Sequence, residues 1–173
     1  DFERATFIEP LACCLRAVNK LPIQSGDSVL VIGLGVMGLI NGTLVRRAGA
    51  DMVLGSDFCA GRRDRSAAWG YNASFDPREP DFVDQVLAQT DGRGVDHVVG
   101  GPGKVAAVEQ ALQVVGAGAT VLLFSPFAQT DHLQLSLHQL YFGELSVVSS
   151  YSCGARETRA ALDLIAGEAL PVR

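Results

Sequence analysis

The chain has 173 residues, 48% of them hydrophobic, which fits one compact domain with a sizeable core. Its formal net charge is −5 and its 14 Lys and Arg residues are scattered, so no basic surface for a nucleic acid backbone is expected. The longest apolar stretch, Val29 to Ile40, is shorter than the roughly 20 residues that span a bilayer. The sequence therefore predicts neither a nucleic acid partner nor a membrane partner.

The start of the chain and its cysteines bear on its cellular compartment. The sequence opens on Asp1 rather than Met, and it shows no secretory signal. Cys13, Cys14, Cys59 and Cys153 have no C-x-x-C spacing that would indicate a zinc clip or a redox pair. We expect reduced, partly buried thiols in a cytoplasmic protein, and a chain that is a piece of a longer one.

The first third of the chain carries a strand-turn-helix pattern. Helical spacing of apolar residues predicts a helix over Glu9 to Leu21, which the turn residues Gln24 to Asp27 end. The short apolar run Ser28 to Ile32 predicts a strand. A glycine-rich segment, Gly33 to Gly38, then leads into a helix that continues to about Ala48.

The middle of the chain alternates predicted strands and helices. In chain order we expect strand 52–56, helix 60–69, strand 72–75, helix 80–90, strand 95–99, helix 105–115 and strand 119–124. Strands that are apolar throughout and joined by helices indicate a parallel sheet covered on both faces. The predicted fold class is α/β, a Rossmann-type doubly wound parallel sheet with helices on both faces.

The segment after residue 124 is less regular. Leu133, Leu135 and Leu137 alternate with polar residues, which is the period of a half-exposed strand. The unpaired edge of such a strand predicts a homodimer or homotetramer. A final core strand is expected over 145–150 and a closing helix over 156–166.

The glycine-rich segment Gly33-Leu34-Gly35-Val36-Met37-Gly38 has the G-x-G-x-x-G spacing of a dinucleotide-binding turn. Gly33 allows the tight turn, Gly35 lets a pyrophosphate approach the backbone, and Gly38 lets the helix pack closely on the strand. The N-terminus of that helix offers free N–H groups and the positive end of its dipole to the pyrophosphate. These residues therefore predict a dinucleotide site.

An acidic residue follows the second predicted strand. Asp57 lies at about the spacing from the glycine turn at which a carboxylate meets the hydroxyls of the adenosine ribose. A carboxylate there repels a 2′-phosphate, so the sequence predicts NAD rather than NADP. Arg62 is expected along the adenosine; alternatively it forms, with Arg63 and Arg65, a solvated helix face.

Several catalytic patterns are absent from the sequence. No Tyr is followed four residues later by Lys, which excludes the short-chain dehydrogenases, and no G-x-S-x-G or Walker lysine is present. His97, His132 and His138 show no metal-ligand spacing. The chain therefore offers a cofactor site without an evident catalytic set.

At this point the sequence resembles the cofactor domain of zinc-dependent medium-chain alcohol dehydrogenases, in the sorbitol and threonine dehydrogenase branch. The matching segments are Glu9-Pro10-Leu11-Ala12, Gly26-Asp27, the glycine turn Gly33 to Gly38, Asp57, Asp91-Gly92-Arg93-Gly94-Val95-Asp96, Val108-Glu109-Gln110-Ala111-Leu112 and Gly118. Their order and spacing carry the resemblance over almost the whole chain.

The resemblance implies NAD as cofactor, zinc in the full-length enzyme and a small-molecule alcohol, a polyol or amino alcohol, as substrate. In that family a preceding catalytic domain holds the zinc through Cys, His and Glu residues, so no catalytic residue is expected in this chain. The resemblance places Glu9 beside the metal, as a fourth ligand or a neighbour; alternatively Glu9 stabilises the first turn of its helix.

By the same matching, Met37, Asp57 and Arg62 contact the adenosine and pyrophosphate. The backbones of Phe124-Ser125-Pro126 and Ser150-Tyr151 line the nicotinamide end. The resemblance also implies that 1–173 form one dinucleotide-binding domain, in which 1–22 carry the helix that arrives from the catalytic domain. Residues 151–173 then carry the closing helix that leads back to it.

Two positions depart from the family pattern, and two other functions remain open. Gly100 stands where an acid is usual, which loosens the rim of the cofactor cleft, and Ser125 replaces a glycine, which narrows the nicotinamide pocket. A methyltransferase that uses S-adenosylmethionine also has a glycine turn and an acid after its second strand. A stand-alone NAD-sensing module fits the same domain.

Overall fold

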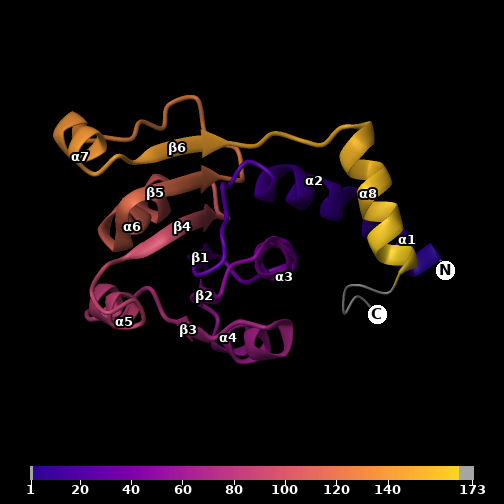
Figure 1. Cartoon of the computed structure of the whole chain (residues 1–173), viewed down its shortest axis with the longest axis horizontal. Helices are drawn as coiled ribbons and strands as arrows, with labels where there is room; N and C mark the ends of the chain where they lie inside the picture. Colours follow the sequence, from indigo (N-terminus) through magenta and orange to yellow (C-terminus); the bar gives the residue numbers. More distant parts are fainter. Residues whose placement is uncertain (1, 168–173) are drawn as a thin grey trace.

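A single six-stranded sheet organises the computed structural model, which describes residues 2–167 (Figure 1). Its strands are β1 Ser28–Ile32, β2 Met52–Ser56, β3 Ala73–Phe75, β4 Val95–Gly100, β5 Val115–Leu123 and β6 Ser146–Ser149. They lie in the order β3-β2-β1-β4-β5-β6, and every neighbouring pair is parallel. The predicted Rossmann-type α/β fold is confirmed.

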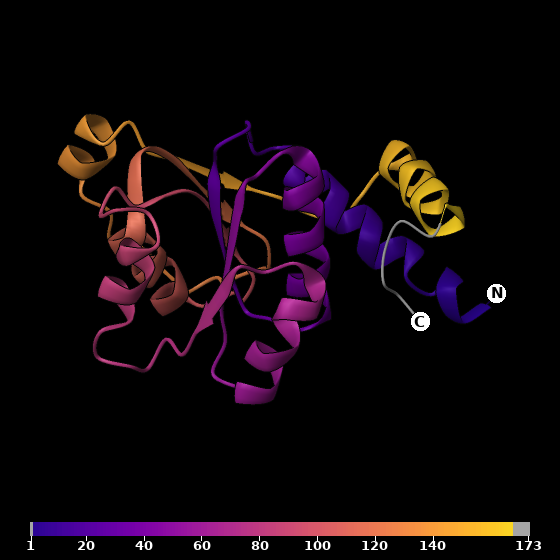
Figure 2. The ribbon, with the colours of Figure 1, turned by 60° about the horizontal axis from the view of Figure 1, so that its bottom comes forward.

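Helices cover both faces of the sheet (Figure 2). They are α1 Phe2–Ala5, α2 Ile8–Val18, α3 Val36–Ala48, α4 Ala60–Ser66 with the 3-10 turn η1 Ala67–Trp69, α5 Phe82–Ala88, α6 Val105–Val114, α7 Leu137–Phe142 and α8 Ala155–Ala166. One hydrophobic cluster joins α2, α3 and α8 to the sheet, and a second joins α5 and α6 to it. The chain is therefore wound on both sides of the sheet.

Strand β1 explains why the core has two halves. All five of its residues are buried, and because side chains of a strand point alternately to opposite faces, Val29 and Val31 enter the cluster of α2 and α3. Leu30 and Ile32 enter the cluster of α5 and α6. A fully apolar strand is thus required at this central position.

The carboxyl ends of three strands meet at one edge of the sheet. Ile32 at the end of β1 is level with Ser56 of β2 on one side and with Gly100 of β4 on the other. The strand order reverses between β1 and β4, which leaves a crevice at the switch point where such sheets bind ligands. The glycine turn opens into this crevice.

The strand predicted over Leu133 to Leu137 is wrong. Residues 131–136 form no strand, and Leu137 is the first residue of α7. The Ser136 hydroxyl accepts a hydrogen bond from the Gln139 N–H at 3.3 Å and caps this helix, while Leu133 packs against the α5–α6 cluster. The alternating leucines therefore reflect one buried contact and a helix start.

Strand β6 exists as predicted, but the expectation of a core strand is wrong. Three of its four residues are exposed, because the segment lies at the free edge of the sheet (Figure 1). Other boundaries shift by a few residues: the first predicted helix ends at Val18, and α5 begins at Phe82 rather than at Pro80. Residue 1 and residues 168–173 of the two predicted terminal segments lie outside the described residues.

Over residues 2–167, no helix combines the length and the apolar character that crossing a membrane requires.

Candidate functional site

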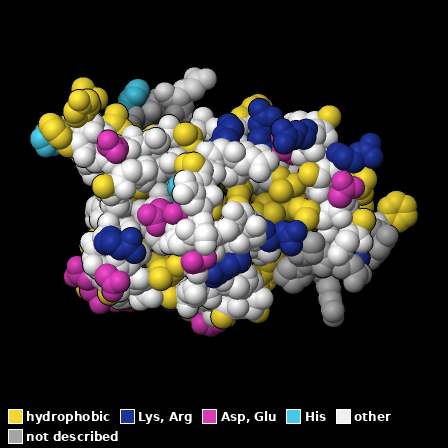
Figure 3. Space-filling view, in the orientation of Figure 1, with side chains coloured by type: hydrophobic (Ala, Val, Ile, Leu, Met, Phe, Trp, Pro, Cys, Tyr) yellow, Lys and Arg dark blue, Asp and Glu magenta, His cyan; other side chains and the backbone are white. Residues whose placement is uncertain are grey.

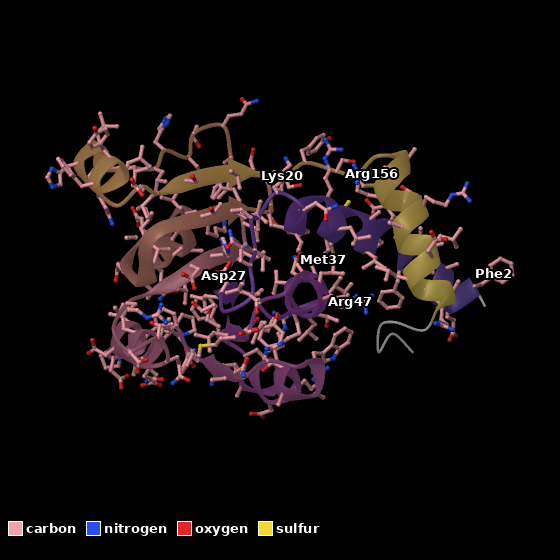
Figure 4. The ribbon with its side chains drawn as sticks, viewed as in Figure 1. Phe2, Lys20, Asp27, Met37, Arg47 and Arg156 are labelled. Carbon is pink, nitrogen blue, oxygen red and sulfur yellow. The ribbon has the colours of Figure 1, made fainter. Side chains whose placement is uncertain are left out.

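Two adjoining clefts lie at the carboxyl ends of the strands. The first has a volume of about 740 Å³ and the second about 530 Å³, and Met37, Phe124 and Ser125 line both. Met37 lies in the first turn of α3 and packs against the hydrophobic cluster that includes α2 (Figure 4). The sequence-predicted residues that line the first cleft are Gly33, Gly35, Val36, Met37, Gly38, Asp57, Arg62, Phe124 and Ser125. Those that line the second are Glu9, Met37, Phe124, Ser125, Pro126, Ser150 and Tyr151.

The glycine turn is shaped by three different requirements. Gly33 has a φ of +89°, in the left-handed region that favours glycine. A Cβ on Gly38 would lie 1.8 Å from the Gly33 carbonyl oxygen, so a side chain there collides with the backbone. A Cβ on Gly35 would meet nothing within 4 Å and would project into open space. The backbone conformation thus requires glycine at Gly33, and close packing requires it at Gly38. Neither reason applies to Gly35, which lines the first cleft.

Helix α3 begins at this turn without a side-chain cap. Its N-cap residue is Gly35, which makes no side-chain capping bond, and its first turn contains no acidic residue. The free N–H groups and the positive end of the helix dipole are therefore left for an anionic group in the first cleft.

Asp57 is nearly buried, with 7% of its surface exposed, and it fastens the turn to the end of β2. Its Oδ2 accepts a hydrogen bond from the Leu34 N–H, and its Oδ1 accepts one from the Cys59 N–H, both at 2.8 Å. An ionised carboxylate has about four acceptor positions, and with the Arg62 Nη1 bond to Oδ2 at 3.4 Å three of them are occupied, so one remains for a ligand. The ligand role that the sequence indicates for Asp57 stays a prediction, and sequence reasoning missed this structural role.

Three arginines pair with Asp57 or Asp76, and one of them, Arg62, lines the first cleft. Arg62 Nη1 lies 3.4 Å from Asp57 Oδ2, and Arg63 donates to the Asp57 carbonyl oxygen at 2.6 Å and pairs with Asp76 at 3.1 Å. Arg78 also pairs with Asp76, and its hydrogen bonds hold the pKa of that carboxyl well below its usual range. Arg62 thus faces the cleft, and Arg63 is already engaged.

The second cleft brings together segments far apart in the sequence. Glu9 comes from α2, Phe124 and Ser125 follow β5, and Ser150 and Tyr151 follow β6. Lys20, near the end of α2, donates a hydrogen bond to the carbonyl oxygen of Ser149 in β6 (Figure 4). This contact joins α2 to the carboxyl end of β6.

A carboxylate and two thiols gather at the second cleft. The ligand atoms of Glu9, Cys13 and Cys153 all lie within 4.8 Å of one another, and Cys13 Sγ donates to Glu9 Oε1 at 3.1 Å. Burial and the neighbouring Glu9 carboxylate raise the pKa of the Cys13 thiol to about 12. All four cysteines are free thiols, but the expected partial burial is wrong for Cys59, which is exposed. The sequence did not indicate that Cys13 and Cys153 meet.

Sequence reasoning missed other residues that line the first cleft. Asn41 and Ser56 are buried there, and their side-chain polar atoms have no hydrogen-bond partner among residues 2–167. Gly101 and Lys104 border the cleft after β4. The rule that ligands bind outside the carboxyl ends of strands would have indicated the residues after β4, whereas no sequence pattern marked Asn41.

The strand order and the glycine turn at the switch point define a Rossmann-type nucleotide-binding domain. The family model for zinc-binding dehydrogenases matches residues 36–167. The chain belongs to this family, as its resemblance predicted. Membership, together with a last strand that is parallel rather than antiparallel, disfavours the methyltransferase alternative.

Individual relatives agree with this assignment. A sorbitol dehydrogenase of Halalkalibacterium halodurans is 30% identical over 166 residues, which are 95% of this chain and 48% of that protein. An L-threonine 3-dehydrogenase of Pyrococcus horikoshii is 37% identical over 121 residues, which are 70% of this chain and 34% of that protein. The chain thus spans about half or less of the length of these curated relatives.

A solved structure matches the fold closely. It is described as a zinc-binding dehydrogenase from Sinorhizobium meliloti 1021 bound to NADP, and it has 33% identity and a TM-score of 0.91. The match covers 98% of this chain and 50% of that protein.

Proposed function

We propose that this chain is the NAD-binding domain of a zinc-dependent dehydrogenase that oxidises a polyol or an amino alcohol. The observation that carries the proposal is the glycine turn, which opens at the switch point with Gly35 facing open space beside the uncapped start of α3. Relatives named sorbitol and L-threonine dehydrogenases support the substrate class. A nicotinamide cofactor supplies the hydride acceptor for such a reaction.

The proposed binding mode divides the cofactor between the two clefts. Backbone N–H groups at Gly35 and Val36 bind the pyrophosphate, and Lys104 adds a positive charge on the opposite wall of the first cleft. Asp57 and Arg62 lie along the adenosine. Phe124, Ser125, Pro126, Ser150 and Tyr151 line the nicotinamide end, where the two clefts adjoin.

Glu9 is proposed to face the zinc of the full-length enzyme. Its side chain lies on the wall of the second cleft, at the nicotinamide end, and a carboxylate is a suitable zinc ligand. The alternative of a helix-stabilising role is supported by its position in the first turn of α2. The other ligands, and most of the substrate pocket, belong to the catalytic domain in this proposal.

A first prediction follows for the isolated chain: it binds cofactor but oxidises neither sorbitol nor L-threonine. The remaining zinc ligands and the walls that enclose an alcohol are expected outside it. Cofactor reduction is measured at 340 nm with and without added Zn²⁺. Zinc-dependent turnover by the purified chain would contradict the proposal.

A second prediction concerns the choice between NAD and NADP. We propose that Asp57 selects NAD, because its carboxylate offers charge-assisted hydrogen bonds to the ribose hydroxyls and repels a 2′-phosphate. Asp57→Ser should weaken NAD binding about ten- to hundred-fold and strengthen NADP binding, since Arg62 then faces the phosphate without its anionic partner.

Isothermal titration with both cofactors measures this selection. Asp57→Asn is the matched variant, since it keeps the size of the side chain and one acceptor oxygen but removes the charge. The NADP held by the Sinorhizobium meliloti relative makes this comparison informative. Equal affinity of the native chain for NAD and NADP would refute Asp57 as the selector.

Two finer features belong to the same proposal. We propose a homodimer, formed through the free edge of β6 and the exposed helix α7, in place of the incorrectly predicted strand at Leu133 to Leu137.

We also propose a cytoplasmic location, supported by four cysteines that are all free thiols. A stand-alone NAD-sensing module would share the cofactor cleft and lack a zinc-holding domain.

A further inference from the structure

Three ligand-type side chains converge where α2 meets the segment after β6. Glu9 and Cys13 are four residues apart on α2 and therefore lie on the same face of the helix. Cys153 joins them because α8, which follows it, packs against α2. Gly154 is the N-cap residue of α8, and its N–H donates to Glu157 Oε2 at 2.8 Å, which fixes the position of the neighbouring Cys153 backbone.

The distances suit a small metal ion. In a tetrahedral site with bonds of about 2.0–2.3 Å, neighbouring ligand atoms lie about 3.5–3.8 Å apart. The three ligand atoms here are within 4.8 Å of one another, and the Cys13–Glu9 pair is already at 3.1 Å. Side-chain rotations that move the atoms by about 1 Å would complete the geometry.

The types of ligand select the kind of ion. Two sulfur atoms and one carboxylate oxygen suit zinc and similar borderline-soft ions, whereas Mg²⁺ and Ca²⁺ prefer oxygen ligands alone. Three protein ligands leave a fourth position open, as in zinc sites that admit water or a substrate. Glu9 and Cys13 also line the second cleft, so this open position is accessible from it.

We propose that Glu9, Cys13 and Cys153 form a binding site for a divalent cation of the zinc class, held by this chain alone. In the chain by itself, Glu9 serves this ion together with two thiolates rather than the zinc of the full-length enzyme, and this inference stands whether or not the proposed dehydrogenase function is correct. The second cleft beside it is open to solvent, since its lining residue Tyr151 is 88% exposed, so an added metal ion can reach the site.

Cobalt(II) is the probe for this site, because thiolate coordination gives it a charge-transfer band in the near ultraviolet and visible d–d bands. Titration of the reduced 173-residue chain should show that one Co²⁺ binds per chain and gives thiolate bands. One equivalent of Zn²⁺ should displace the Co²⁺ and remove these bands. Cys13→Ser and Cys153→Ser should each weaken binding at least tenfold. Cys59→Ser, which changes the exposed cysteine before α4 and outside the Glu9, Cys13 and Cys153 group, should leave binding unchanged.

A Glu9 variant tests the same site if the cysteine variants do not fold. Glu9 is exposed, so Glu9→Gln should keep the unfolding temperature and still weaken Co²⁺ binding at least tenfold. Absence of thiolate bands in the native chain would overturn the proposal. Bands that persist unchanged in Cys13→Ser and Cys153→Ser, or that vanish in Cys59→Ser, would also overturn it.

Discussion

The central strands of the sheet and its β6 edge differ in how completely the chain buries them. Around β1, β2 and β4, nearly every strand residue is buried, and the glycine turn and Asp57 are tied together by internal hydrogen bonds. At the β6 edge, three of the four strand residues are exposed, and the neighbouring helix α7 has no buried residue. We call β1, β2, β4 and the glycine turn the covered region, because the chain itself buries them. We call β6 and α7 the exposed region, because only another molecule could bury their surface.

Helix α7 carries three large apolar side chains that are mostly exposed. Leu137, Tyr141 and Phe142 are 78%, 77% and 70% exposed, and the Tyr141 and Phe142 rings pack edge to face. Figure 3 shows apolar side chains gathered at the tip that α7 forms, in the upper left. Apolar groups gathered in this way mark an interaction surface, so the two regions should respond differently to substitution.

The largest effect is expected at Gly38 in the covered region. Gly38→Ala places a Cβ 1.8 Å from the Gly33 carbonyl oxygen, and because backbone must move, we expect a loss of about 3 kcal/mol or more. For a chain of this length that corresponds to an unfolding temperature lower by about 6–12 °C. Differential scanning calorimetry of the two proteins measures the change.

Gly35→Ala is the matched control for this substitution. A Cβ there meets nothing within 4 Å, so the unfolding temperature should stay within about 2 °C of the native value while NAD affinity falls. Equal unfolding temperatures of the Gly38→Ala and native chains would show that the close packing of the glycine turn on α3 is not required for stability.

A smaller effect is expected from one hydroxyl in the same region. The Tyr71 hydroxyl is buried and donates to the Gly38 carbonyl oxygen at 2.6 Å. Tyr71→Phe removes this bond and should cost about 1 kcal/mol, which is about 2–4 °C in unfolding temperature. Urea denaturation gives the free energy directly, and an unchanged midpoint would indicate that the bond adds nothing.

The smallest effect on chain stability is expected in the exposed region. Tyr141→Ser should change the free energy of unfolding of the monomer by less than about 0.5 kcal/mol, because the side chain is 77% exposed. The same substitution should shift the mass measured by light scattering from dimer toward monomer. Leu162→Ser, at a 44% exposed position on α8, is the control and should leave the dimer intact. A native chain that is monomeric at tens of micromolar would contradict the proposed interface.

The covered region is also the part that the sequence predicts well. Its strands are apolar throughout and its turn carries glycines at fixed spacing, so local patterns determine β1, α3 and β2 nearly to the residue. The exposed region is less predictable. The leucines at 133–137 alternate as in a strand, but the Ser136 cap and the packing of the partly buried Leu133 decide the structure instead.

The candidate site divides in the same way. Residues next to the glycine turn and at strand ends were identified from spacing and from the family resemblance. The meeting of Cys13 with Cys153 depends on how α8 packs on α2, and no local pattern encodes a contact between residues so far apart. The bonds from the Leu34 and Cys59 N–H groups to Asp57 likewise appear only when strand and turn are placed in space.

The most direct test of the account is an NMR titration of the isotope-labelled chain with NAD. Binding at the switch point predicts that the largest amide shifts occur at Gly33, Gly35 and Gly101, which line the first cleft, while amides of α7 change little. Unshifted amides in the glycine turn at saturating NAD, or the largest shifts on β6 and α7, would contradict the assignment of the covered region as the cofactor site.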